Sequence, residues 1–119
     1  MENSYIWSIN GCEIEVDMED ADTVDRYISA LKILENADNK QVLNISEKIR
    51  TYCKAFREFY DAFLGEGTSE KIFSGINDNS RKYDEVFESL LDVISRQRAE
   101  SESRIAGIAQ RYAPKRQLK

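Results

Sequence analysis

Residues 42–64, VLNISEKIRTYCKAFREFYDAFL, carry apolar side chains in steps that alternate between three and four residues. Such steps place the side chains along one stripe of an α-helix, so the segment predicts a central helix from about Asn39 to Leu64. The stripe consists of Val42, Ile45, Ile49, Tyr52, Phe56, Phe59 and Phe63, and it is widened by Cys53, Tyr60 and Leu64. This apolar surface is wider than one neighbouring helix would cover.

Upstream of this helix, residues 5–17 predict a β-hairpin. Asn10 and Gly11 form the preferred two-residue type I′ turn, in which both positions need a positive φ. Folding about this turn sets Trp7 opposite Ile14 and leaves one face of the hairpin apolar and the other polar. An isolated hairpin is marginally stable in water, so we expect the apolar face to pack on the helices that follow.

Further helices are predicted on both sides of the central one. Residues 20–36 show helical spacing of apolar side chains, with Asp20 or Asp22 as the cap. A last helix begins near Asn79 or Ser80, and its apolar stripe stops at Ile94.

Between the central and last helices, residues 65–75 predict a loop and a short helix. We expect Gly65 to form a left-handed cap at the end of the central helix, and Thr68 to be the N-cap of the short one. Phe73 would then pack inward and Gly75 would end the turn. The predicted fold class is therefore mainly α (α+β), with an N-terminal β-hairpin packed on a bundle of three longer helices plus one short helix.

Beyond Ile94 the pattern changes. Residues 95–103, SRQRAESES, offer no apolar face, and a small amphipathic patch at Ile105, Ile108 and Tyr112 follows. We predict one domain over residues 1–95 and a basic, partly helical or disordered C-terminal tail over residues 96–119. Two interpretations of the patch stay open, a frayed tail and a binding site for a partner protein. In the second, Tyr52, Phe56 and Tyr60 of the central helix would contribute to the same surface.

The charge of the chain is strongly polarised. Eight acidic residues and no Lys or Arg occur through Asp25, whereas residues 96–119 contain seven basic and two acidic residues. Such polarity leaves homo-oligomerisation open, for example by head-to-tail stacking of copies. A sequence pI near 4.8 argues against nucleic acid as a partner.

The sequence lacks the residue type that most often serves as a general base or a metal ligand, and it lacks the common phosphate-binding motifs. The 119-residue chain contains no histidine, and its five glycines match neither the P-loop nor the dinucleotide fingerprint. Cys12 and Cys53 have no metal-type or redox-type spacing and are expected to be buried, reduced thiols. We therefore predict no enzyme activity, no cofactor and no metal site. Neither a signal peptide nor a membrane span is indicated, which predicts a cytoplasmic protein.

Two blocks of sequence carry a resemblance to a known group of proteins. Residues 6–27, IWSINGCEIEVDMEDADTVDRY, and residues 59–75, FYDAFLGEGTSEKIFSG, resemble a family of small prophage proteins of Gram-positive bacteria. The resemblance covers roughly residues 6–95, and the glycine-and-KIF spacing of the second block is its more specific part. The family is encoded among tail-morphogenesis genes, and its members look like tail assembly chaperones.

This resemblance implies a function in the cytoplasm of the bacterial host cell. A tail assembly chaperone binds the long helical tape measure protein, or another tail protein, before the tail tube polymerises. Two alternatives stay open: a structural tail completion or connector component, and a small prophage regulator that binds a host protein. No site residue is transferred from the family.

Overall fold

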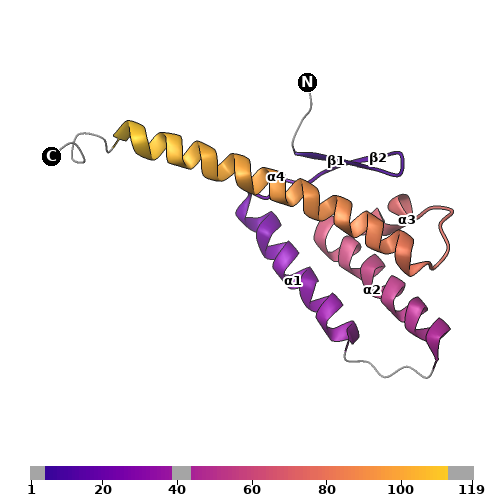
Figure 1. Ribbon diagram of the computed structural model, residues 1–119. Coiled ribbons are helices and arrows are strands. Elements are labelled where there is room, and N and C mark those ends of the chain that lie inside the picture. The colour runs from indigo at the N-terminus through magenta and orange to yellow at the C-terminus, as the bar shows by residue number, and fades with distance from the viewer. Residues whose placement is uncertain (1–4, 39–43, 113–119) are drawn as a thin grey trace.

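The computed structural model describes residues 5–38 and 44–112 and shows a hairpin followed by four helices (Figure 1). In chain order the elements are β1 (Ile6–Ile9), β2 (Cys12–Glu15), α1 (Ala21–Asp38), α2 (Ile45–Leu64), α3 (Thr68–Ile72) and α4 (Ser80–Tyr112). The predicted fold class is confirmed: the chain is mainly helical, with one short and three longer helices. No helix in the described part of the chain combines the length and the hydropathy that crossing a bilayer requires.

The hairpin turn has the backbone geometry that its sequence requires. Asn10 and Gly11 have φ angles of 48° and 81°, as a two-residue type I′ turn demands. The antiparallel register pairs Trp7 with Ile14. Trp7 is 1% exposed and stacks on Tyr60 of α2, with 5.8 Å between the ring centroids, so the apolar face of the hairpin closes one side of the core.

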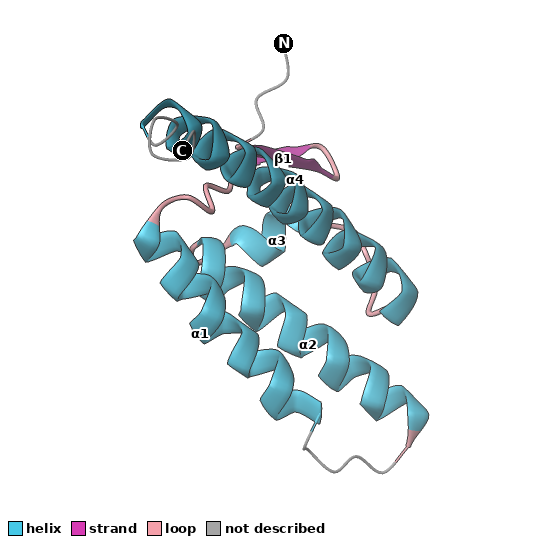
Figure 2. Ribbon diagram, turned by 60° about the vertical axis from the view of Figure 1, so that its left-hand side comes forward, coloured by secondary structure: helices cyan, strands magenta, loops and turns pink. Residues whose placement is uncertain are grey.

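The helices α1 and α2 form an antiparallel pair, and α4 crosses above them (Figure 2). α1 begins where the Asp20 carboxylate accepts a hydrogen bond from the Thr23 backbone N–H, at 3.0 Å. α2 begins at Ile45, later than the predicted Asn39, because the Asn44 side chain caps it by accepting from the Glu47 backbone N–H at 2.8 Å. Asn39 and Val42, at the start of the predicted stripe, lie outside the described residues.

The connection from α2 to α3 corrects two predictions. Gly65 follows the last residue of α2 and has a φ of 114° and a ψ of 149°, which is not the left-handed helical conformation that we predicted. The residue at the N-cap of α3 is Gly67, not Thr68. Asp61 of α2 caps α3 instead: its carboxylate accepts from the backbone N–H and the hydroxyl of Ser69, at 2.8 and 3.1 Å.

After α3 the chain turns toward α4. Phe73 is buried and stacks face to face on Tyr83 of α4, with ring centroids 3.9 Å apart. Gly75 has a φ of 76° in the turn that follows. Asn79 then caps α4, because its side chain accepts from the Lys82 backbone N–H at 3.0 Å.

The longest element, α4, does not stop where its apolar stripe was predicted to end. It continues without a break through Ile94 to Tyr112, and its C-terminal part projects away from the other elements (Figure 1). The described residues consequently span 67 Å along the longest axis. The boundary predicted after residue 95 therefore falls inside a helix, and no structural break coincides with it.

Candidate protein-binding surface

The middle of α4 is held by a buried polar side chain that the apolar pattern does not reveal. Gln97 is 1% exposed, and its amide lies against the segment that joins β2 to α1. The Gln97 Nε2 donates to the Val16 carbonyl at 2.6 Å, and the Met18 backbone N–H donates to the Gln97 Oε1 at 2.8 Å. The amide thus satisfies one backbone donor and one backbone acceptor, which makes its burial tolerable.

Two further contacts fix α4 against the N-terminal part of the chain. The Trp7 Nε1–H donates to the Ser89 hydroxyl at 2.9 Å. Two turns beyond Gln97, Arg104 forms an ion pair with Glu19, whose carboxylate also accepts from the Tyr5 hydroxyl at 2.8 Å. The hydrogen bonds from Arg104 lower the pKa of Glu19, and the hydrogen bond from Tyr5 acts in the same direction. The acidic N-terminal region and the basic C-terminal region of the chain therefore contact each other within a single copy.

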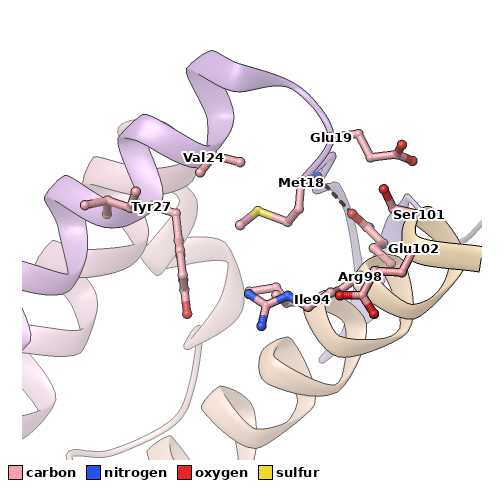
Figure 3. Close-up of a pocket in the computed structure, with 10 residues that line it drawn as sticks. Met18, Glu19, Val24, Tyr27, Ile94, Arg98, Ser101 and Glu102 are labelled. Carbon is pink, nitrogen blue, oxygen red and sulfur yellow. Dashed lines mark hydrogen bonds between the residues drawn. The ribbon is translucent and has the colours of Figure 1, made fainter. Parts of the chain in front are cut away.

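Beside these contacts lies a groove of about 290 Å³ between α4 and the start of α1. Figure 3 shows Met18 extending between the two walls of this groove. Burial raises the pKa of the Tyr27 hydroxyl, and the positive charge of Arg98 on the opposite wall partly opposes that rise. Its lining residues are Met18, Glu19, Val24, Tyr27, Ile28, Ile94, Gln97, Arg98, Ser101 and Glu102.

The α4 wall of the groove continues into the projecting end of the helix. Positions 94, 98, 101, 105, 108 and 112 follow one another in steps of three or four residues and therefore share one stripe. Ile105 is 58% and Ile108 is 38% exposed, so this stripe presents large apolar side chains to solvent. Tyr112 is the last residue of α4, and its side chain lies outside the description. We refer to the groove and this stripe together as the α4 surface.

The residues of α2 predicted to bind a partner are placed differently. Phe56 and Tyr60 are 5% and 0% exposed, because the hairpin, α3 and α4 cover the stripe that seemed too wide for one neighbour. The prediction that they contribute to an open surface is therefore wrong. Tyr52 is half-buried, and its hydroxyl donates to Asp84 of α4. The structure thus brings none of these three residues together with Ile105 and Ile108.

Acidic side chains near the α4 surface do not form a metal cluster. Within residues 5–38 and 44–112, no group of three or more His, Cys, Asp or Glu side chains is arranged to hold a metal ion. What the α4 surface offers chemically is apolar area bordered by single charges, and such a surface suits the binding of another polypeptide.

Comparison with known proteins supplies a family. A family model described as a family of unknown function, DUF6673, matches residues 10–119. The chain belongs to DUF6673. The match includes the projecting end of α4, which the resemblance noted in the sequence does not cover. No curated protein and no solved structure matches this DUF6673 chain. The family description names no activity, so the prophage and tail-assembly assignment stays a prediction.

Proposed function

We propose that this DUF6673 protein acts by binding an amphipathic helix of another protein along the α4 surface, as a chaperone of phage or prophage tail assembly in the cytoplasm of the host cell. Its client would be the helical tape measure protein. The protein takes part in no reaction and uses no cofactor in this proposal. The sequence resemblance is the reason for naming this client, and the geometry of the α4 surface supports this mode of binding.

The observation that carries the proposal is that the groove-lining stripe of α4 continues along the projecting end of the helix, where Ile105 and Ile108 are exposed. From Ile94 to Ile108 the stripe runs for about 21 Å along one straight helix. A partner helix can follow a straight stripe of this kind with side chains at helical spacing, which is the usual way in which a groove binds an amphipathic helix.

A tape measure protein fits this surface chemically. It is long and helical, and the apolar side of its helices must be shielded until tail-tube subunits surround it. Ile105 and Ile108 stand well outside the core, so they can exchange water for a client without any loss of the protein's own packing.

The proposal is tested by capture from phage-producing cells with the tagged full-length protein as bait. Recovery of the tape measure protein is expected, and Ile108→Asp should weaken that binding about tenfold or more because a charge replaces a central apolar anchor. Ala106→Asp is the matched control, since Ala106 is exposed and lies on the other side of α4. At protein concentrations low enough for a single copy to be present, neither variant should change the melting temperature appreciably.

Three outcomes would overturn the proposal. Unchanged capture of the client by Ile108→Asp would remove the α4 surface from the binding site. Presence of the protein in finished particles would favour a tail completion or connector component. Recovery of a host protein alone, both in these cells and in cells without phage genes, would favour the regulator.

A further inference from the structure

Nearly all large apolar side chains that the described residues leave exposed lie on one flank of the molecule. The exposed large apolar side chains of the described residues are Ile28, Ile45, Leu91, Ile105 and Ile108. Ile28 lines the groove on its α1 side. Leu91 lies on the same stripe of α4 as Ile105 and Ile108, one turn before the groove. Only Ile45, at the start of α2, lies elsewhere.

The stripe of α4 carries aliphatic side chains at both ends and polar side chains at its centre, so its pattern is the same in both directions. Along the helix it presents Leu91, Ile94, Arg98, Ser101, Ile105 and Ile108. When a second α4 is laid antiparallel to the first with its midpoint between Arg98 and Ser101, Leu91 faces Ile108 and Ile94 faces Ile105. The polar centre of one copy then meets the polar centre of the other. At both ends of the contact, Leu91 thus meets Ile108, and Ile105 packs over the part of the largely buried Ile94 that lines the groove.

The charges at this centre are complementary as well. Among the described residues, neither Arg98 nor Glu102 takes part in an ion pair, although Arg57, Arg81, Arg96 and Arg104 all do. Both side chains line the groove. In the antiparallel arrangement, Arg98 of each copy lies beside Glu102 of the other. A two-fold axis therefore produces two identical opposite-charge pairs.

We propose that two copies of this chain form a symmetric dimer in which their α4 helices pack antiparallel along the α4 surface. The projecting end of each copy then runs back along α4 of the other and covers the exposed Leu91 and Ile28 there. A contact of this kind uses the same patch on both copies and closes with two subunits.

The dimer also explains how the end of α4 is stabilised. Beyond Ser101 the helix has 11 residues up to Tyr112, and Arg104, which contacts Glu19 and Tyr5, ties this segment to the N-terminal part of the chain. Isolated helices shorter than roughly 12–15 residues are marginal in water. A second α4 supplies the apolar contact that this segment lacks within a single copy.

The dimer covers the surface assigned above to the client, so the second copy and the client compete. This competition rests on the proposed function, whereas the dimer itself does not. A client helix would displace the second copy by matching the same apolar stripe, and the unloaded protein would keep that stripe out of water.

Charge exchange provides the test, with the purified full-length protein and sedimentation equilibrium as the measurement. The wild type is expected to be a dimer. Arg98→Glu and Glu102→Arg should each weaken self-association about tenfold or more, because both pairs become repulsive. Mixed in equal amounts, the two variants should form a heterodimer of near wild-type affinity, since one then carries two acidic and the other two basic groups at the contact. Glu100→Arg, exposed and off the stripe, should dimerise normally.

Two results would overturn the dimer. A wild type that stays monomeric at the highest accessible concentration and low salt would refute it outright. Failure of the mixed variants to associate, or a loss of association in Glu100→Arg equal to that in Glu102→Arg, would refute the antiparallel pairing. Each of these results leaves the capture of a client untouched, so failure of the dimer and failure of the proposed function can be told apart.

Discussion

The clearest way to probe the anchoring of α4 is to replace Gln97 by leucine. Leucine has a similar size but no polar atoms, so Gln97→Leu removes both hydrogen bonds to the segment between β2 and α1. The Val16 carbonyl is left buried without its partner, and the half-buried Met18 N–H loses its acceptor. An unsatisfied buried group costs about 1–3 kcal/mol and a lost hydrogen bond about 1 kcal/mol, so we expect a loss of roughly 2–4 kcal/mol in the free energy of unfolding.

Urea unfolding followed by the fluorescence of Trp7 measures this loss directly, because Trp7 is buried between the hairpin, α2 and α4. Gln110→Leu is the matched control. Gln110 is exposed on the projecting end of α4, where the same substitution should change stability by less than about 0.5 kcal/mol. Amide exchange of Met18 should accelerate in Gln97→Leu only. If the two variants proved equally stable, the Gln97 amide would not be what holds α4 to the N-terminal segment.

Two further predictions concern buried groups of the core. The Tyr60 hydroxyl is buried and has no hydrogen-bond partner among the described residues, so Tyr60→Phe should be neutral or stabilise the protein by about 1 kcal/mol in thermal or urea unfolding. Tyr83→Phe, which removes a hydroxyl that accepts from Arg57 at 3.0 Å, should instead be destabilising, and the opposite order would contradict the structure. Burial raises the pKa of the Cys53 thiol to about 11, whereas Cys12 is half-buried on the hairpin, so an alkylating reagent at neutral pH should modify Cys12 first. Peptide mass mapping measures the rate at each cysteine. Faster modification of Cys53 would show that α2 is not packed as described.

Local sequence chemistry accounts for the hairpin and for the starts of two helices. The turn at Asn10 and Gly11 needs only two positive φ angles, and the pairing of Trp7 with Ile14 follows from it. The caps at Asp20 and Asn79 act within three residues along the chain. Interactions of such short range are visible in any sequence that contains them, so these elements could be predicted without tertiary information.

The α3 cap could not be found in the same way. Thr68 has the residue type of an N-cap, yet the carboxylate that caps α3 belongs to Asp61 on α2, eight residues before the Ser69 that it binds. Propensity describes what a side chain does with its immediate neighbours. Here the bend between α2 and α3 brings a better acceptor to the exposed N–H groups.

The candidate site, too, could be predicted from the sequence only in part. From the sequence alone, the spacing of Ile105 and Ile108 marked an apolar patch, and the periodicity of α2 established a central helix. The tertiary structure decided that Phe56 and Tyr60 are core, because three other elements cover them. It also decided that α4 continues past Ile94, since Gln97 finds its partner at Val16, 81 residues away. Helical periodicity reports contacts within a few residues, and it cannot show a polar side chain whose burial is made favourable by a distant backbone segment.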